Sequence, residues 1–273
     1  MLIGAVTAAT GGLLLNLRER DLVESERRLN GLALVLAEQI DRSFQSIELI
    51  QTAVIDRMQS LGIASVDDLE RQMSGYDTHQ RFKDRISASP YISAIKLTDS
   101  QGKLINFSRS WPIPSIKHFD QDLSEAFKSD PHLTSFVGNP LRSPATGNWV
   151  VPIARKFTGP DGEFLDLVLG IIEAEQFEQY FKAIAISPNG SIALFRRDGT
   201  LLVRYPRHET TIGQPISHSR LFAHVLSQAD HGTVRQTGAF DGKERLISGR
   251  IRRSGPILSS PKPTIRCGLI NRP

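Results

Sequence analysis

The stretch "FRRDGTLLVRYP", Phe195 to Pro206, holds two short apolar runs separated by Asp-Gly. An earlier stretch, "LTDSQGKLINFSRSWP", Leu97 to Pro112, has the same order of apolar run, aspartate, glycine, apolar run and proline. A polar turn with glycine between two apolar runs is typical of a β-hairpin. The chain therefore contains the same hairpin pattern twice, and this repetition predicts two similar modules in tandem.

Further predicted elements follow each hairpin in a similar order. After the first come a helix in "DQDLSEAFKSD", a strand in "LTSFVG", a long hairpin in "NWVVPIARKF" and "EFLDLVLGIIEA", and a helix in "EQFEQYFKAIA". After the second come a helix near "SRLFAHVLSQA" and strands in "GTVRQTG" and "ERLISGR". Segregated hairpins and helices predict an α+β fold with two tandem antiparallel sheets and helices packed across them.

A long helix is predicted before the first module. Residues 18–61 contain no proline and one glycine, and apolar residues recur at seven-residue spacing, at Ala33, Ile40, Ile47, Val54 and Leu61 with a companion series at Leu22, Leu29, Leu36 and Ile50. This spacing fits either a coiled-coil dimer seam or a stripe that packs on the chain's own domain. Two shorter helices are expected next, in "GIASVDDLERQM", capped by Ser65, and in "YDTHQRFKDRISASP", ending before Pro90.

The first seventeen residues, "MLIGAVTAATGGLLLNL", are uncharged and are followed by the charged run "RERDLVESERR". This boundary predicts either a short transmembrane anchor or a secretory signal without a basic front end. Both place the remaining chain at or across a membrane. Arg18 and Arg20 would indicate a cytoplasmic exit by the positive-inside rule, so charge alone does not fix the orientation.

Composition narrows the classes of function. The 273 residues are 40% hydrophobic and 23% charged, which is typical of a folded chain long enough for two domains. The net charge is +4, but Lys and Arg alternate with Asp and Glu without a basic stripe, so no nucleic-acid partner is expected. The single cysteine, Cys267, cannot form an internal disulfide.

The sequence gives no support for catalysis or metal binding. Neither an HExxH nor an H-x-H spacing occurs among the histidines His79, His118, His132, His208, His218, His224 and His231. No GxSxG, P-loop or GxGxxG motif occurs either. We therefore expect no catalytic residue, no metal site and no cofactor in this chain, and no enzymatic activity.

Three stretches resemble a known family. They are "ESERRLNGLALVLAEQIDRSFQSIELI", "GNPLRSPATGNWVVPIARKFTGPDGEFLDLVLGIIEAEQFEQYF" and "GSIALFRRDGTLLVRYP", and together they resemble the double Cache sensor domains, also called PDC-like and related to PAS domains. The phrase "SPATGNWVVPIARKF" is similar to the sensor half of rhizobial-type diguanylate cyclases or histidine kinases. The resemblance implies a periplasmic sensor region held at the cell inner membrane, a stalk helix that forms a homodimer, and two PAS-like modules.

The expected domains follow from the resemblance and the element pattern. They are a transmembrane or signal-anchor segment at 1–17, a stalk helix at 18–62, a membrane-distal module at 63–186, a membrane-proximal module at 187–252 and an irregular tail at 253–273. Family members end the proximal sheet with a further strand and continue into a second transmembrane helix and an output domain. Because "SGPILSSPKPTIRCGLINRP" shows no such pattern, we expect a truncated or frame-shifted product whose proximal sheet leaves an edge strand exposed.

The resemblance also implies a ligand site. Amino-acid-binding members place Arg-x-Trp after the first hairpin and an acid on the last distal strand. Arg109-Ser110-Trp111 and Glu173 match those positions, although Pro112 replaces an aromatic residue and the acid is one methylene longer. A guanidinium can hold a carboxylate, a carboxylate can pair with an ammonium, and an indole supplies an apolar wall.

Three more residues complete the predicted ligand-binding set. Trp149 and Arg155 lie on the strand from which pockets of this family draw residues, and Phe107 lies on the first hairpin. The alternative is that Arg109 is a solvated charge at a strand end and that Trp111, Trp149 and Phe107 belong to the core.

The function indicated is the extracytoplasmic ligand-sensing region of a bacterial membrane receptor, with a diguanylate cyclase or histidine kinase as its parent. The expected ligand is a small polar metabolite, with an amino acid or a carboxylate as the candidate classes. A second interpretation is a stand-alone periplasmic binding or scaffolding protein that dimerises through its long helix. An enzyme of unrecognised type is the third.

Overall fold

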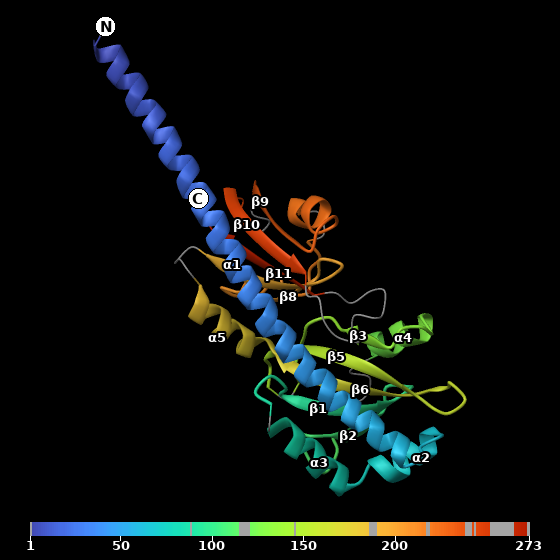
Figure 1. Ribbon diagram of the computed structural model, residues 1–273. Helices are drawn as coiled ribbons and strands as arrows, with labels where there is room; N and C mark the ends of the chain where they lie inside the picture. The colour runs from blue at the N-terminus through green and yellow to red at the C-terminus, as the bar shows by residue number, and fades with distance from the viewer. Residues whose placement is uncertain are drawn as a thin grey trace.

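Figure 1 shows the structure, a computed structural model in which one long helix lies along two sheets. It describes residues 2–87, 89–114, 121–144, 146–185, 190–216, 219–237, 242, 244–251 and 265–271. The backbone alone is described for 2–15, 18, 121–122 and 265–271. The side chains of most of the predicted membrane anchor therefore lie outside the described residues.

Helix α1 (Leu2–Ser60) is continuous from the predicted anchor segment through the predicted stalk. It ends because Gly62 adopts a left-handed conformation with φ of 67°, and the Ile63 N–H then donates to the Met58 carbonyl at 3.2 Å. Helices α2 (Val66–Met73) and α3 (Tyr76–Ser87) follow. The predicted cap is confirmed, because the Ser65 hydroxyl accepts a hydrogen bond from the Asp68 N–H at 3.1 Å.

The first sheet has the strand order β2-β1-β6-β5-β3, and β4 also pairs with β5. All of its pairs are antiparallel. Its elements are β1 (Ala94–Asp99), β2 (Leu104–Phe107), α4 (Gln121–Ser129), β3 (Ser135–Val137), β4 (Leu141–Arg142), β5 (Trp149–Thr158) and β6 (Phe164–Glu173). The first predicted hairpin and the predicted long hairpin are both confirmed.

The second sheet repeats this arrangement, with the strand order β8-β7-β11-β10-β9. In both sheets the opening hairpin lies at one edge and the last strand of the module lies in the centre. Its elements are β7 (Ser191–Arg196), β8 (Leu201–Tyr205), a short π-helical turn η1 (Leu221–Val225), β9 (His231–Thr237), β10 (Glu244–Ile251) and β11 (Ile265–Asn271), and α5 (Ala174–Ile184) connects the two sheets. The α+β prediction with two tandem antiparallel modules is confirmed.

The central strand β11 corrects the prediction of an irregular tail at 253–273. It pairs antiparallel with β7 on one side and with β10 on the other. In the described part of the second sheet, β7 and β10 are therefore each paired on both sides. This differs from the predicted module, in which a missing strand left an edge strand exposed. The run Ile265, Cys267, Leu269 alternates with period two, which is a strand signal, but the prolines before it obscured that signal. Residues 252–264 lie outside the described residues.

The apolar stripe of α1 packs against both sheets of its own chain. Leu29, Leu36, Ile40, Ile47 and Val54 are each at most 2% exposed, and they belong to one core with residues of both sheets. The seven-residue spacing therefore reflects packing within the chain, and these positions do not form a free dimer seam. The exposed apolar residues of the described stalk lie elsewhere on α1, with Val35 51% and Leu49 70% exposed.

Polar contacts fix α1 to each sheet. The Gln51 amide nitrogen donates to the carbonyls of Ile153 at 2.8 Å and Val168 at 2.9 Å in the first sheet. The Asn30 side-chain oxygen accepts from the hydroxyls of Thr233 at 3.0 Å and Ser248 at 2.6 Å in the second. Because these polar groups are buried or half-buried, their hydrogen bonds define the position of the helix along both sheets.

Close approach of α1 to the first sheet depends on Gly170. A Cβ at this position would lie 2.6 Å from the Ile47 Cγ2, which is too close for two carbon atoms. We predict that Gly170→Ala lowers the free energy of unfolding by about 1–3 kcal/mol, measured by urea denaturation. In an Ile47→Ala background, which removes the clashing methyl group, the added cost should largely disappear.

Gly31 on α1 supplies the matched control. A Cβ added at Gly31 would have no other atom within 4 Å, so Gly31→Ala should raise stability by about 0.5–1 kcal/mol through helix propensity. A Gly170→Ala protein as stable as the wild type would contradict the packing described here.

A buried acid lies in the first sheet, where Asp166 of β6 is opposite Asp99 of β1. Asp166 is fully buried, and neither carboxyl oxygen accepts a hydrogen bond of good geometry from a described residue. Burial raises the pKa of Asp166 well above its ordinary value of 3.8, and the nearby Asp99 carboxylate raises it further, while the N–H groups of Leu167 and Thr98 only partly offset this effect.

Asp166 therefore predicts how stability depends on pH. Above pH 3.8 the unfolded chain loses a proton that the folded chain retains, so this residue makes stability fall as pH rises through that range. Asp166→Asn, which stays neutral, should raise the melting temperature at pH 7, and the gain should shrink as the pH approaches 4. Asp161→Asn in an exposed turn is the control and should change little at either pH. A gain for Asp166→Asn that does not vary with pH would contradict this explanation.

Candidate functional site

The structure brings together two of the predicted ligand residues, Arg109 and Glu173. Arg109 follows β2, and Glu173 is the last residue of β6, next to the start of α5. The Arg109 Nη2 donates to the Glu173 Oε1 at 2.9 Å, and the two side chains are 34% and 15% exposed. Ser108, just before Arg109, is buried and its hydroxyl accepts from the Ile95 N–H at 2.9 Å, which fixes the backbone that presents the guanidinium.

Trp111 lies against helix α3. Its ring contacts those of Tyr76 and His79 at centroid distances of 5.7 and 5.8 Å, and the residue is 40% exposed. His79 is buried, and its Nδ1 donates to the Phe107 carbonyl at 2.7 Å, joining α3 to the end of β2. The described ring contacts of Trp111 therefore attach this segment to α3.

Phe107 and Arg155 lie on opposite faces of the first sheet. Phe107 is buried in a cluster with Leu123 and Phe127 of α4 on the face away from α1. The Arg155 guanidinium instead donates to the Thr52 hydroxyl of α1. These two predicted ligand residues thus contribute to different layers of the first module.

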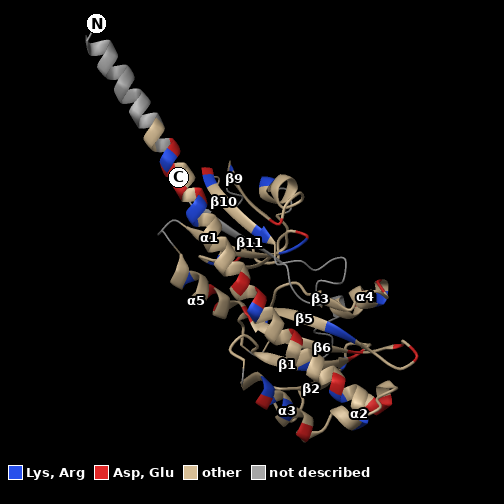
Figure 2. Cartoon of the chain, viewed as in Figure 1, with Lys and Arg blue, Asp and Glu red and all other residues tan. Residues whose placement is uncertain are grey.

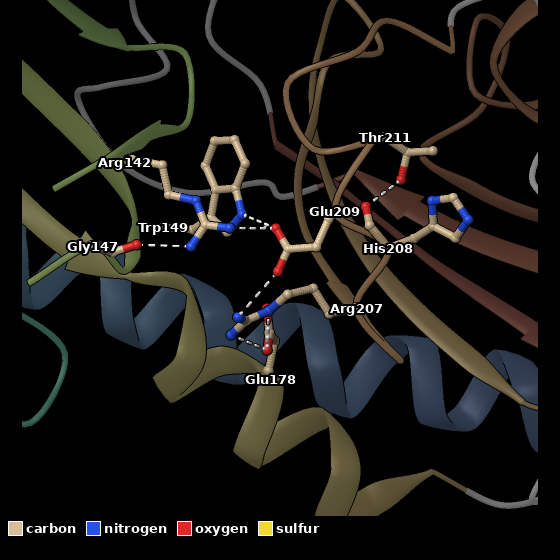
Figure 3. A network of polar contacts seen from close by, with 8 residues as sticks. All are labelled: Arg142, Gly147, Trp149, Glu178, Arg207, His208, Glu209 and Thr211. Carbon is tan, nitrogen blue, oxygen red and sulfur yellow. Dashed lines mark hydrogen bonds and ion pairs between the residues drawn. The ribbon is translucent and has the colours of Figure 1, made fainter.

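Trp149 lies where the two modules meet (Figure 3). Its indole Nε1 donates to the Glu209 Oε2 at 2.7 Å, and the Arg142 guanidinium lies 4.7 Å from its ring centroid. Arg142 also contacts the same Glu209 oxygen at 2.6 Å. Arg142 and Trp149 come from β4 and β5 of the first module, whereas Glu209 follows β8 of the second, so these contacts join the modules.

The junction extends to helix α5. Arg207 lies 3.6 Å from Glu209, and its guanidinium makes a bidentate contact with Glu178 of α5 at 2.7–2.9 Å. Sequence reasoning did not identify Glu178, Arg207 or Glu209. Their partners are distant in sequence, and the charged run that follows Tyr205-Pro206 carried no recognisable motif.

The neighbours of Glu209 favour its charged form. The hydrogen bond from Trp149 lowers the pKa of Glu209 below its ordinary value of 4.5, and the charges of Arg142 and Arg207 lower it further. The hydrogen bond that Arg207 donates to Glu178 favours the charged form of Arg207 as well, and for a cation this raises the pKa. A carboxylate with a lowered pKa adds stability above its ordinary pKa, and this contribution is lost as the pH falls through the folded-state pKa.

We predict that Trp149 fluorescence reports this loss. In a Trp111→Phe background, where Trp149 is the sole tryptophan, emission should change as the pH falls below 4.5 and the carboxylate is protonated. In the Glu209→Gln variant of that background this acid transition should be absent. The same transition with and without Glu209 would contradict the assignment.

The described residues do not contain a group of three or more side chains suited to hold a metal ion. Two of the histidines considered in the sequence, His118 and His218, lie outside the described residues. Figure 2 shows acidic and basic residues interspersed along α1, α2 and α3. Within the part of the chain that the structure describes, no helix has an apolar stretch long enough to cross a membrane.

Comparison with known proteins agrees with the fold. The model of the dCache_1-like family, described as a histidine kinase sensor domain, matches residues 174–259. The chain is similar to the extracellular domain of rpHK1S-Z16, a protein described as a histidine kinase, at 23% identity and a TM-score of 0.74, over 91% of this chain and 95% of that one. A comparison with curated protein sequences finds no match.

Two chemoreceptor domains are also similar. The periplasmic sensory domain of Campylobacter jejuni Tlp1 has 10% identity and a TM-score of 0.70, with 91% of this chain and 95% of that one covered. The ligand-binding domain of the Pseudomonas aeruginosa amino acid chemoreceptor PctC, solved with GABA, has 13% identity and a TM-score of 0.59, with 90% and 99% covered. The resemblance to double Cache sensor domains is confirmed: the chain has the fold of the extracellular sensor domains of histidine kinases and chemoreceptors.

Proposed function

We propose that this chain is the extracytoplasmic ligand-sensing region of a bacterial membrane receptor and that it binds a small polar metabolite at Arg109 and Glu173. The observation that carries the proposal is the ion pair of these two residues at the boundary between β6 and α5. Solved domains of the same fold bind amino acids, including GABA and L-alanine. The region itself is non-catalytic, and a diguanylate cyclase or histidine kinase is its parent.

The chemistry of the pair suits a zwitterion. A ligand carboxylate can take the place of Glu173 on the Arg109 guanidinium, and a ligand ammonium can bind the freed Glu173 carboxylate. The Glu173 side chain is largely shielded from water at 15% exposed, which strengthens its contacts, whereas the Arg109 side chain is 34% exposed and can be reached from solvent. An amino acid supplies both charges on one small molecule, whereas a simple carboxylate supplies only the first.

The position of Glu173 offers a route to the second module. This residue immediately precedes α5, and α5 carries Glu178, which binds Arg207 of the second module. A ligand that moves Glu173 can therefore change the start of α5 and the contacts of Glu178. The signal would be a shift between conformations, limited by the difference in ligand affinity for each.

The membrane and dimer parts of the proposal concern α1. Residues 1–17 anchor the chain in the inner membrane, and the sensor region is periplasmic. A homodimer uses the outer side of α1, where Leu34, Val35 and Leu49 are exposed, because the inner stripe is already buried within the chain.

A thermal-shift screen of the full chain against the amino acids and small carboxylic acids tests the ligand site. We expect at least one amino acid to raise the melting temperature, because binding to the folded state alone stabilises it. Arg109→Gln or Glu173→Gln should weaken the affinity for that amino acid about tenfold or more, through loss of a charge-assisted hydrogen bond.

The matched control is Arg235→Gln, which removes an exposed ion pair with Glu244 in the second sheet. It should leave the affinity unchanged. A ligand whose binding is insensitive to both Arg109 and Glu173 would overturn the site, and a screen without any stabilising compound would count against ligand sensing.

A further inference from the structure

A cavity of about 280 Å³ is lined by residues of α1, α2 and α3. Helices α2 and α3 lie at the end of the molecule farthest from the N-terminus (Figure 1). Its lining includes the apolar side chains of Val54, Met73 and Phe82, which are 2–3% exposed. Such a cavity is slightly smaller than the roughly 300 Å³ at which pockets for drug-sized ligands begin. It therefore suits a ligand of few non-hydrogen atoms.

Three arginines also line this cavity: Arg57 of α1 and Arg81 and Arg85 of α3. Among the described residues none of their guanidinium groups has an ion pair or hydrogen bond, whereas Arg71, Arg109, Arg142, Arg196, Arg207 and Arg235 all pair with acids. The one acid in the lining, Asp77, leaves the cavity with a net charge of +2, from three positive charges and one negative. An anion would reduce the repulsion among these cations.

We propose that this cavity binds a small organic anion with an apolar body, such as an aromatic or short aliphatic monocarboxylate. The carboxylate contacts the guanidinium groups of Arg57, Arg81 and Arg85, and the apolar body covers the side chains of Val54 and Phe82. Because Arg57 belongs to α1 and the other two arginines belong to α3, the ligand holds these helices together. Such binding stabilises the folded chain.

This site is separate from the pair of Arg109 and Glu173. Met73 and Phe82 belong to the core that contains α1, whereas Ile171, two residues before Glu173 on the same strand, belongs to the cluster on the other face of the first sheet. The proposal thus does not depend on the proposed function. Either site can fail experimentally without affecting the other.

The test measures binding of phenylacetate and of its neutral analogue phenylacetamide to the full chain, by calorimetry and by amide chemical shifts. We expect phenylacetate to shift the amide signals of Ala53, Thr78 and Phe82 and to bind about tenfold or more tightly than phenylacetamide, because only the acid offers a charge to the arginines. Acetate, which lacks the apolar body, should bind more weakly than phenylacetate.

Four variants assign the binding to this cavity. Arg81→Gln should weaken phenylacetate binding about fivefold or more, and Asp77→Asn should strengthen it by removing the like charge. Lys83→Gln is the matched control, since Lys83 is an exposed cation on the same helix outside the lining, and it should change nothing. Arg109→Gln, in the other site, should also leave phenylacetate binding unchanged.

Three outcomes would overturn the proposal. They are no measurable binding of phenylacetate, equal binding of the acid and the amide, and equal weakening by Arg81→Gln and Lys83→Gln. The last result would indicate general attraction to a cationic helix instead of a defined site. Circular dichroism of each variant verifies that a loss of binding does not reflect a loss of fold.

Discussion

Close packing of α1 against both sheets is the constraint on which the remaining structure depends. The helix approaches the first sheet closely enough for Ile47 to lie over Gly170, and Gln51 satisfies two sheet carbonyls at that contact. Asn30 makes the corresponding polar contact with the second sheet. One helix therefore spans both modules, which also meet at the junction of Trp149, Glu209 and Arg207.

The repeated topology depends on local sequence patterns and on one strand pairing that no local pattern indicates. The two hairpin turns that begin with aspartate and contain glycine, the Ser65 cap and the alternating strands could be predicted from the sequence, because each depends on neighbouring residues. The central position of β11 could not, since a strand seven residues long after a proline-rich stretch gains its stability from pairing with β7 and β10. In the first sheet the last strand, β6, likewise lies between the opening hairpin and the other strands. The tandem repeat was therefore the available clue to the central position of β11.

Among the predicted ligand residues, too, some positions follow from the sequence and others depend on tertiary packing. Arg109 and Glu173 could be paired from the sequence because the resemblance fixed both positions, and the structure brings them within 2.9 Å. Arg155 and Trp149 could not be placed, because tertiary packing alone determines that their shared face of β5 meets α1 and that the start of this strand meets the second module. Arg155 consequently contacts α1, and Trp149 binds Glu209. The proposed ligand pair of Arg109 and Glu173 is thus distinct from the junction at Trp149 and Glu209.

Amide hydrogen exchange of the full chain tests the central role of α1 most directly. If the helix is packed on both sheets, amides between Leu29 and Met58 should exchange as slowly as those of β6 and β10, because they open only when the sheets do. Rapid exchange throughout that part of α1, alongside protected β6 and β10, would show that the helix is not held by the sheets and would contradict the account.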